Sequence, residues 1–383
     1  QHTTCRRQRQ MCIRDSDTFE AAKAYFRPHL GQLHDPFLMQ DMDKAVARLL
    51  DAITQNEAVM VFGDYDVDGT TSVSMLTHFL RNQGVPVTTY IPDRYAEGYG
   101  LSKQGIEAAK EANIQCIVAL DCGVKAIAQA EYSASLGIDL IICDHHTPGE
   151  TLPKALAVLD PKRSDCAYPY KELCGCGIGF KLMQGVAQKQ GKDVDTLGAY
   201  LDFVAVAIAA DLVPITDENR TLAYLGLQQI QVASRPGLKA ILRDKTNGQS
   251  ISDVVFGAAP RINAAGRMKH GLHAVELLLS NSEQEAAHIA GEIETFNTSR
   301  KEVEQEITQE ALAQIEANNE EESATSVVFS SNWHKGVIGI VASRLIEKYY
   351  RPTLVFTKAN EGILAASALS LIHISEPTRQ FRI

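Results

Sequence analysis

Carboxylates and imidazoles gather directly after three separate apolar runs of the sequence. The residues concerned are Asp64, Asp66, Asp68, Asp121, Asp144, His145 and His146. Isolated carboxylates on core strands would be costly to desolvate, whereas a shared cation offsets that cost. Hard divalent cations select oxygen-rich ligand sets. The grouping therefore predicts a metal-dependent enzyme, with more than one bound cation.

The segments that carry these groups read as an alternating α/β pattern. Short apolar, β-branched runs predict strands at 58–62, 85–91, 114–120, 138–143 and 155–159. Helical patterns separate them at 70–82, 102–112 and 125–136. Such alternation predicts βαβ units and a parallel sheet. Ligands of parallel sheets bind beyond the carboxyl ends of the strands, so the acidic groups should converge at one edge.

The remainder of the sequence predicts helices and a second, smaller unit. Helical patterns cover 173–188 and 196–210, the latter followed by Asp211, and more helices follow to about residue 280. Residues 283–318 are charged and helix-favouring with few apolar positions, which is typical of a solvent-bridging connector. Runs at 325–329, 337–348 and 353–356 then begin a small α/β domain. We therefore expect a catalytic domain over 17–280, a connecting helix over 281–320 and a partial domain over 321–368.

Both ends of the chain break from this pattern. Residues 1–16 and 369–383 resemble translated adapter or vector sequence, the alternative being disordered termini. We leave both segments out of the fold prediction.

Composition limits the class of protein. A length of 383 residues favours two domains, and 45% hydrophobic with 22% charged residues is ordinary globular material. The net charge of −10 argues against a generally basic surface but does not exclude nucleic acid, since a local basic groove can still act. Eight irregularly spaced cysteines without a secretory signal predict a reducing cytoplasm. No apolar stretch approaches the roughly 20 residues of a membrane helix.

Two other known motifs could also account for the acidic segment that begins at Asp64. An EF-hand loop beginning at Asp64 requires a Glu at its twelfth position, which is Met75 here. A haloacid-dehalogenase phosphatase would use Asp66 as nucleophile and Asp68 as acid and base, but has no use for the later Asp-His-His segment. A turn rich in Asp explains one or two carboxylates and not the whole set.

Eight segments in order resemble a known family. GDYDVDGTTS, ALDCGV, CDHHTPG and AIAADLVP resemble the four motifs of the DHH phosphoesterase superfamily. Within it, IPDRYAEGYGL, ELCGCGIGFKL, PRINAAGRM and NWHKGVIGIVASRL are similar to the RecJ group of single-stranded-DNA exonucleases. The resemblance covers roughly residues 33–368. It implies a parallel-sheet DHH domain joined by a long helix to a smaller α/β domain of the DHHA1 kind, incomplete here.

The resemblance also implies two Mn²⁺ or Mg²⁺ ions. Motif position assigns the ligands Asp64, Asp66, Asp68, Asp121, His145 and Asp211. Asp64 and Asp66 would hold one ion, Asp121 would bridge both, and the remaining three would hold the second. Two such ions about 4 Å apart activate water for in-line phosphoryl displacement. Asp121 and His145 are thereby catalytic as well as metal-binding residues.

His146 is the third catalytic residue that the resemblance implies. It would contact the scissile phosphate or protonate the leaving oxygen from beside the metals. The alternative is a hydrogen-bonding partner that orients Asp144. Asp144 itself is expected to support the ligands without binding an ion.

Other segments would bind the DNA. Arg94, Arg261 and Arg267 are suited to bidentate phosphate binding, and some of them would form the pocket for the 5′ end, the alternative for each being a structural ion pair. Asn263 and His334 are further expected phosphate contacts.

Two other features receive separate predictions. Tyr95 and Tyr99 could stack on bases, although packing is equally expected. Cys174-Gly175-Cys176 has the wrong spacing for zinc, and we interpret it as a glycine-rich turn that brings a helix near the sheet.

The chain departs from the family near its C-terminus. Ser367, also an expected DNA contact, begins a Ser-x-Arg-Ser element in which Leu369 replaces the Arg. The expected Gly-Gly-His motif and oligonucleotide-binding domain do not follow. We therefore expect this chain to bind Mn²⁺ but to degrade long strands poorly.

The resulting hypothesis is a 5′→3′ exonuclease that releases 5′-mononucleotides from single-stranded DNA during recombination and repair. The expected partners are a strand with a 5′ end, a helicase and a single-strand-binding protein, with a monomeric cytoplasmic enzyme and no membrane. The alternatives are a nano-RNase or cyclic-dinucleotide phosphodiesterase of the same superfamily, and a non-catalytic replication or repair scaffold.

Overall fold

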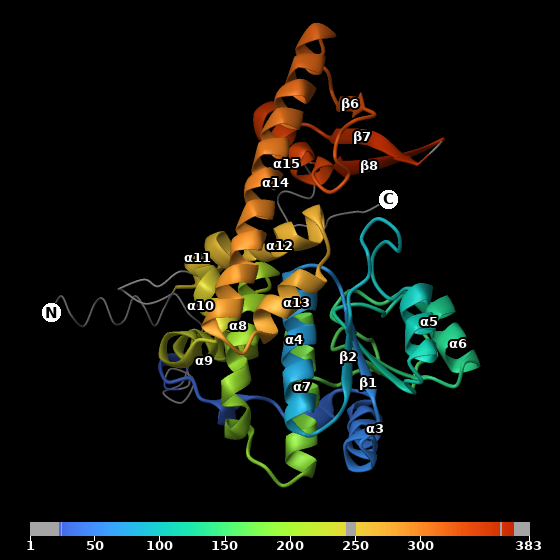
Figure 1. The fold of residues 1–383 in the computed structure, drawn as a ribbon, viewed down its shortest axis with the longest axis vertical. Coiled ribbons are helices and arrows are strands. Elements are labelled where there is room, and N and C mark those ends of the chain that lie inside the picture. Colours follow the sequence, from blue (N-terminus) through green and yellow to red (C-terminus); the bar gives the residue numbers. More distant parts are fainter. Residues whose placement is uncertain (1–22, 24, 243–249, 361, 371–383) are drawn as a thin grey trace, which may run out of the picture.

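The computed structural model describes residues 23, 25–242, 250–360 and 362–370, which form two α/β units joined by one long helix (Figure 1). The predicted tail at 1–16 and residues 371–383 of the second tail lie outside the described residues. Among the described helices, none has the length and apolar character needed to cross a membrane.

The first unit contains the predicted parallel sheet. Its strands are β1 (Val59–Gly63), β2 (Val87–Tyr90), β3 (Cys116–Leu120), β4 (Asp139–Cys143) and β5 (Ala157–Leu159). They pair in the order β2-β1-β3-β4-β5, all parallel. The central strands are apolar throughout because helices cover both faces of the sheet. The α/β fold class expected from the sequence is therefore confirmed.

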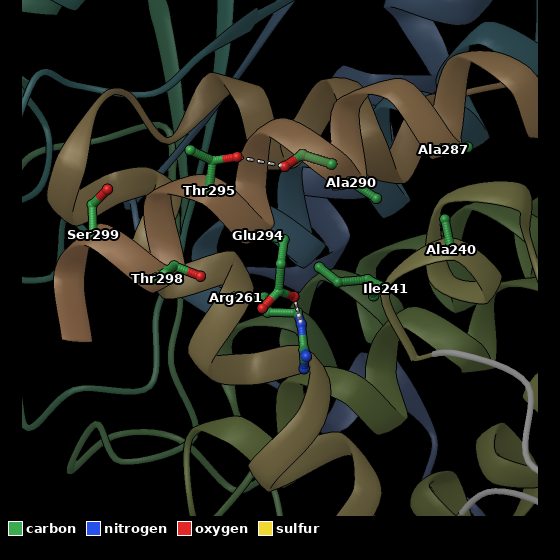
Figure 2. A pocket seen from close by; sticks show the side chains of 10 residues that line it. Ala240, Ile241, Arg261, Ala287, Ala290, Glu294, Thr295, Thr298 and Ser299 are labelled. Carbon is green, nitrogen blue, oxygen red and sulfur yellow. Dashed lines mark hydrogen bonds and ion pairs between the residues drawn. The ribbon is translucent and has the colours of Figure 1, made fainter. Parts of the chain in front are cut away.

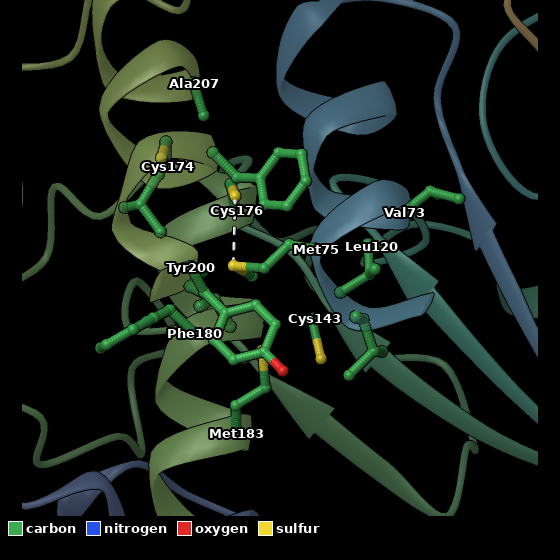
Figure 3. Close-up of a cluster of buried hydrophobic side chains, with 14 of the residues drawn as sticks. Val73, Met75, Leu120, Cys143, Cys174, Cys176, Phe180, Met183, Tyr200 and Ala207 are labelled. Atoms are coloured by element: carbon green, nitrogen blue, oxygen red, sulfur yellow. Dashed lines mark hydrogen bonds between the residues drawn. The ribbon is translucent and has the colours of Figure 1, made fainter. Parts of the chain in front are cut away.

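Alternate side chains of β1 enter two different cores. Val59 and Val61 pack into the larger core, with α3 (Met42–Gln55), α4 (Val67–Asn82), α7 (Gly175–Lys189) and α8 (Leu201–Ala210). Met60 and Phe62 pack on the opposite face, against α5 (Lys103–Glu111) and α6 (Ile127–Ser135). Figure 3 shows part of the larger core, where Met75 of α4 meets Cys176 of α7 with their sulfurs 3.7 Å apart.

Further helices extend the larger core. These are η1 (Leu30–Gln32), η2 (Pro36–Leu38), η3 (Val194–Tyr200), α9 (Asp217–Ala233), α10 (Pro236–Leu242), α11 (Ile251–Asp253), the π-helical turn η4 (Val254–Ala258), α12 (Ala259–Met268) and α13 (Leu272–Leu279). The single helix predicted over 196–210 is divided into η3 and α8. Gly198, a poor helix former, lies in the 3₁₀ segment, which explains where the α-helix fails to extend.

The predicted connecting helix is α14 (Glu283–Ala317), the long helix of Figure 1. Ser282 caps it by accepting a hydrogen bond from the amide of Glu285 at 3.2 Å. Contrary to the prediction of a solvent-bridging connector, α14 packs into the cores of both units. Ile293 joins the core of the first unit, whereas Ile307 and Ile315 join that of the second. The apolar stripe of α14 is narrow, and for this reason the sequence of the helix looks mostly polar.

The second unit is a three-stranded sheet with one covering helix. Its elements are β6 (Ser326–Ser330), α15 (Ile338–Tyr349), β7 (Thr353–Asn360) and β8 (Ile363–Leu369). β6 and β7 are parallel, and β7 and β8 are antiparallel. The sequence did not predict β8. Leu369, assigned to the suspect tail, ends this strand opposite Thr353.

Candidate metal centre

Acidic residues form a row along the carboxyl edge of the large sheet. The register aligns Gly63 with Leu120, Leu120 with Cys143, and Cys143 with Leu159. The residues that follow these strand ends are Asp64, Asp121, Asp144 and Asp160. All four are buried. Parallel pairing therefore produces the predicted convergence, and adds Asp160, which sequence reasoning did not identify because its strand is short.

The turn from β1 into α4 delivers the next two carboxylates. Asp66 caps α4, since its Oδ1 accepts a hydrogen bond from the amide of Gly69 at 3.0 Å. A Cβ on Gly69 would lie 2.3 Å from the carbonyl oxygen of Asp64, so only glycine permits this close approach of strand and helix. Asp68 follows in the first helical turn and is buried. Asp64, Asp66 and Asp68 thus surround a single tight turn.

The N-terminus of α7 points at Asp68. The amides of Gly175 and Cys176 donate to Asp68 Oδ2 and Oδ1 at 2.6 and 2.8 Å. The positive end of the helix dipole favours a carboxylate here. A Cβ on Gly175 would lie 2.6 Å from Cβ of Asp121. The Cys-Gly-Cys segment therefore brings a helix near the sheet as predicted, and also holds Asp68, a contact that the sequence did not indicate.

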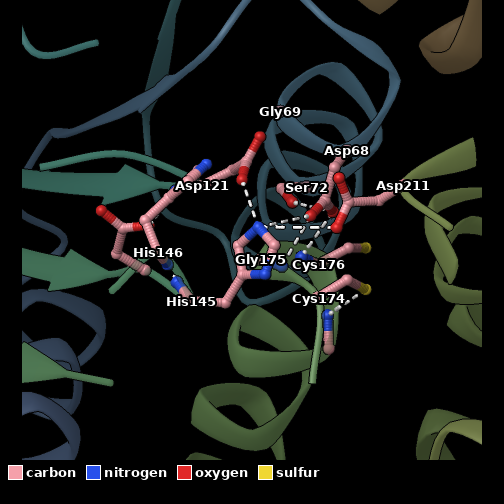
Figure 4. A network of polar contacts seen from close by, with 12 residues as sticks. Asp68, Gly69, Ser72, Asp121, His145, His146, Cys174, Gly175, Cys176 and Asp211 are labelled. Carbon is pink, nitrogen blue, oxygen red and sulfur yellow. Dashed lines mark hydrogen bonds and ion pairs between the residues drawn. The ribbon is translucent and has the colours of Figure 1, made fainter. Parts of the chain in front are cut away.

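His145 lies at the centre of the cluster, as Figure 4 shows. Its Nε2 is 3.2 Å from Asp121 Oδ1, 3.8 Å from Asp68 Oδ2 and 3.6 Å from Asp211 Oδ2. Among the described residues, three triplets have ligand atoms all within 4.8 Å of one another. They are Asp64–Asp66–Asp121, Asp68–His145–Asp211 and Asp121–His145–His146. The structure thus brings together all six residues that the sequence predicted as metal ligands.

The electrostatics of this cluster fit bound cations. Burial, reinforced by neighbouring carboxylates, raises the pKa of Asp68 to about 7 and that of Asp211 to about 8. Burial and the neighbouring carboxylates also raise the pKa of Asp121 well above its ordinary value.

The imidazole of His145 also suits a metal site. Burial, followed by the charge of His146, lowers the pKa of His145 to about 3, which keeps the ring neutral and able to coordinate. Within the described part of the chain, neither ring nitrogen of His145 has a hydrogen-bond partner. Carboxylates that resist ionisation beside an unpartnered neutral imidazole suit two hard divalent cations.

His146, a member of one of these triplets, also pairs with Asp144. Its Nδ1 lies 2.7 Å from Asp144 Oδ1, and the amide of Val124 donates to Asp144 Oδ2 at 2.8 Å. Burial alone would lower the pKa of His146, but the hydrogen bond to Asp144 raises it to about 9. The same contact outweighs burial at Asp144 and lowers its pKa to about 2. At neutral pH the pair is therefore an imidazolium held by a carboxylate.

Several predicted DNA contacts lie where the two units meet. Tyr95 Oη donates to the carbonyl of Arg267 at 2.5 Å, and Arg267 Nη1 donates to the carbonyl of Gly336 at 3.0 Å. The ring of His334 packs edge-on against Tyr95, with centroids 6.0 Å apart. Arg94 stacks over the ring of Tyr65 at 4.3 Å. Tyr95 thus packs against the second unit through His334, while Arg267, which accepts its hydrogen bond, donates to Gly336 of the second unit.

The other predicted DNA contacts are placed differently. Arg261 donates to Glu294 Oε2 at 2.5 Å and to the carbonyl of Gly257, in a hollow between α10, α12 and α14 (Figure 2). This is the structural ion pair that the sequence left open as the alternative. Asn263 lies on α12. Ser367 lies on β8 and faces α15 at Gly339.

Similarity to known proteins extends over most of the chain. Residues 58–208 match the family model "DHH family, N-terminal domain". A single-stranded-DNA-specific exonuclease RecJ of Bacillus subtilis is 40% identical over 364 residues, which cover 94% of this chain and 45% of that protein.

Solved structures agree with the sequence match. A crystal structure of exonuclease RecJ bound to manganese superposes with a TM-score of 0.79 and 31% identity, covering 89% of this chain and 84% of that one. RecJ of Thermus thermophilus in complex with Mn²⁺ gives a TM-score of 0.77 and 30% identity, covering 91% of this chain and 49% of that one. The chain spans about half the length of the curated relatives it matches.

Proposed function

Because this chain belongs to the DHH family and, within it, to the RecJ proteins, we propose that it hydrolyses single-stranded DNA in the 5′→3′ direction with two bound Mn²⁺ or Mg²⁺ ions. The observation that carries the proposal is that the triplets Asp64–Asp66–Asp121 and Asp68–His145–Asp211 lie with the Asp144–His146 pair at one sheet edge. The similarity to manganese-bound RecJ structures supports it. The products would be 5′-mononucleotides.

The ligands divide between two sites. Asp64 and Asp66 would hold one ion, His145 with Asp68 and Asp211 the other, and Asp121 would lie between them. When bound, the two ions supply Lewis-acid polarisation of the phosphate and a water nucleophile usable at neutral pH. The amides of α7 would hold the Asp68 carboxylate in position for such an ion.

His146 would act on the phosphate from beside the metal ligands. Asp144 occupies Nδ1, so only Nε2 can reach substrate. An imidazolium Nε2–H can donate to a phosphate oxygen or pass its proton to the leaving oxygen. Asp144 would orient the ring and maintain its charge without binding an ion.

The 5′ end of the DNA strand would bind where the two units meet. Arg94, Arg267 and His334 lie there and offer cationic or donor groups to a terminal phosphate. Asn263 and Ser367 remain proposed phosphate contacts. Arg261 would have to exchange Glu294 for phosphate to contribute.

The cellular setting is part of the proposal. We expect a monomeric enzyme of the cytoplasm that acts in recombination and repair. A helicase would supply unwound strands, and a single-strand-binding protein would share them.

The test uses short single strands labelled at either end, with 5′ phosphate or 5′ hydroxyl, with Mn²⁺ or with EDTA. We expect labelled 5′-mononucleotide first from the 5′-labelled strand, only with Mn²⁺, and faster with 5′ phosphate. Asp121→Ala should abolish the release, whereas a non-catalytic scaffold would lose nothing. Release of label first from the 3′ end, or a preference for dinucleotides over longer strands, would contradict the proposal.

A further inference from the structure

Tyr99 occupies the open side of His146. Its hydroxyl oxygen lies 3.2 Å from His146 Nε2, and the two rings meet nearly at right angles, with centroids 6.0 Å apart. The tyrosine remains 47% exposed, so its position does not result from burial in a core. An exposed aromatic side chain held against a half-exposed histidine, which is itself paired with a buried carboxylate, requires a local cause.

The loop between β2 and α5 supplies that cause. Glu97 accepts hydrogen bonds from the amide of Asp93 at 2.8 Å and from Tyr90 Oη at 2.9 Å, which closes the loop. Asp93 Oδ1 in turn accepts from the amide of Tyr95 at 2.8 Å. This network fixes the segment that leads into Tyr99.

Two glycines then set the direction of Tyr99. Gly98 and Gly100 flank it with φ values of +90° and +78°, a conformation that side-chain-bearing residues rarely adopt. The glycines and the hydrogen-bonded loop together fix the backbone from which the Tyr99 side chain extends.

The geometry around His146 leaves one approach for substrate. Nδ1 is taken by Asp144, so a phosphate oxygen must reach Nε2. The Tyr99 hydroxyl lies 3.2 Å from that nitrogen, so an oxygen at hydrogen-bond distance of one group is within reach of the other. A tyrosine hydroxyl is protonated at neutral pH and can donate.

We propose that Tyr99 is a catalytic residue that donates a hydrogen bond to the same phosphate oxygen as His146. The inference rests on the proposed phosphodiester hydrolysis and adds a contact to it. Two donors converging on one oxygen stabilise the charge that develops in the transition state more than the charge of the ground state. The ring of Tyr99 also packs edge-on against the ring of Tyr65, with centroids 6.3 Å apart, and Arg94 stacks on the same Tyr65 ring. These contacts connect Tyr99 to the proposed 5′-end site.

The test is Tyr99→Phe, which removes one oxygen and keeps the ring. We expect kcat for Mn²⁺-dependent hydrolysis of a 5′-phosphorylated strand to fall about 10- to 100-fold with KM nearly unchanged. Mn²⁺ binding, measured by calorimetry, should be unchanged. Tyr224→Phe is the matched control, because Tyr224 lies on α9 and is exposed to a similar degree, 43%.

The outcomes separate the two proposals. An active wild type with an unaffected Tyr99→Phe variant overturns the role of Tyr99 alone. A variant with lower KM and unchanged kcat also overturns it, because Tyr99 would then be a cap that substrate displaces. A wild-type chain without Mn²⁺-dependent hydrolysis overturns the proposed function and this inference together.

Discussion

Gly175→Ala is the substitution that most sharply tests how the fold builds the metal centre. The new Cβ would lie 2.6 Å from Cβ and 2.8 Å from Cα of Asp121. Ordinary contacts between carbon atoms are about 3.5–4.0 Å, so α7 and the β3 end must separate by roughly 1 Å. The same shift lengthens the hydrogen bonds from Gly175 and Cys176 to Asp68.

The magnitude follows from these two effects. Overpacking of this kind typically costs about 1–3 kcal/mol, and weakening hydrogen bonds to a charged group costs about 1.5–3 kcal/mol. We expect the free energy of unfolding to fall by about 2.5–6 kcal/mol in EDTA. Because Asp121 and Asp68 belong to different ligand triplets, Mn²⁺ affinity should also fall, by at least about tenfold.

The assay is urea unfolding in EDTA together with Mn²⁺ calorimetry. Gly291→Ala is the matched control, because no atom lies within 4 Å of its added Cβ and Gly291 is inside α14. Alanine there should leave Mn²⁺ affinity unchanged and stabilise the helix by up to about 1 kcal/mol. The reasoning is refuted if Gly175→Ala matches wild type in both unfolding free energy and Mn²⁺ affinity.

Three further perturbations test other parts of the account. In EDTA, the raised pKa values of Asp68, about 7, and Asp211, about 8, mean that stability should fall progressively as pH rises from about 4, the ordinary pKa of an aspartate, to about 8. Thermal melts should show this loss and Mn²⁺ should suppress it, whereas pH-independent melts would contradict it. Lys181→Met leaves fully buried Glu218 without its ion-pair partner at 2.9 Å and should lower the free energy of unfolding, measured in urea, by about 3–5 kcal/mol. The double variant Lys181→Met with Glu218→Gln should recover most of that loss. Equal stability of wild type and the single variant would argue against a buried ion pair. Tyr95→Phe removes the hydrogen bond to α12 and should raise KM for 5′-phosphorylated strands several-fold at unchanged Mn²⁺ affinity. An unchanged KM would argue against a binding site for the 5′ end where the two units meet.

The sheet and its acidic edge were predictable because local patterns determine both. Apolar runs bounded by helices specify parallel strands, and parallel strands deliver whatever follows them to one edge. Asp64, Asp121 and the Asp144–His146 segment therefore converge without any knowledge of tertiary contacts. The start of α5 is equally local, because the hydroxyl of its N-cap Ser102 accepts a hydrogen bond from the amide of Gly105 at 3.0 Å.

Other features depend on contacts between distant segments. The amides of Gly175 and Cys176 meet Asp68 across more than 100 positions of sequence, and no residue type marks a backbone donor. The aim of Tyr99 depends on a loop closed by Glu97, so the sequence left base stacking and packing equally open. β8 was missed because its segment, rich in alanine, lacks the β-branched residues that mark a strand.

The central claim is that the acidic edge of the large sheet holds two divalent cations. Counting Mn²⁺ bound per chain by equilibrium dialysis, for wild type and for Asp121→Asn, tests it most directly. We predict two ions for wild type and weakened binding at both sites in the variant, since Asp121 shares a ligand triplet with Asp64 and Asp66 and lies 3.2 Å from His145, which shares another with Asp68 and Asp211. A wild type that binds no Mn²⁺, or a variant that binds two ions with unchanged affinity, would contradict the account.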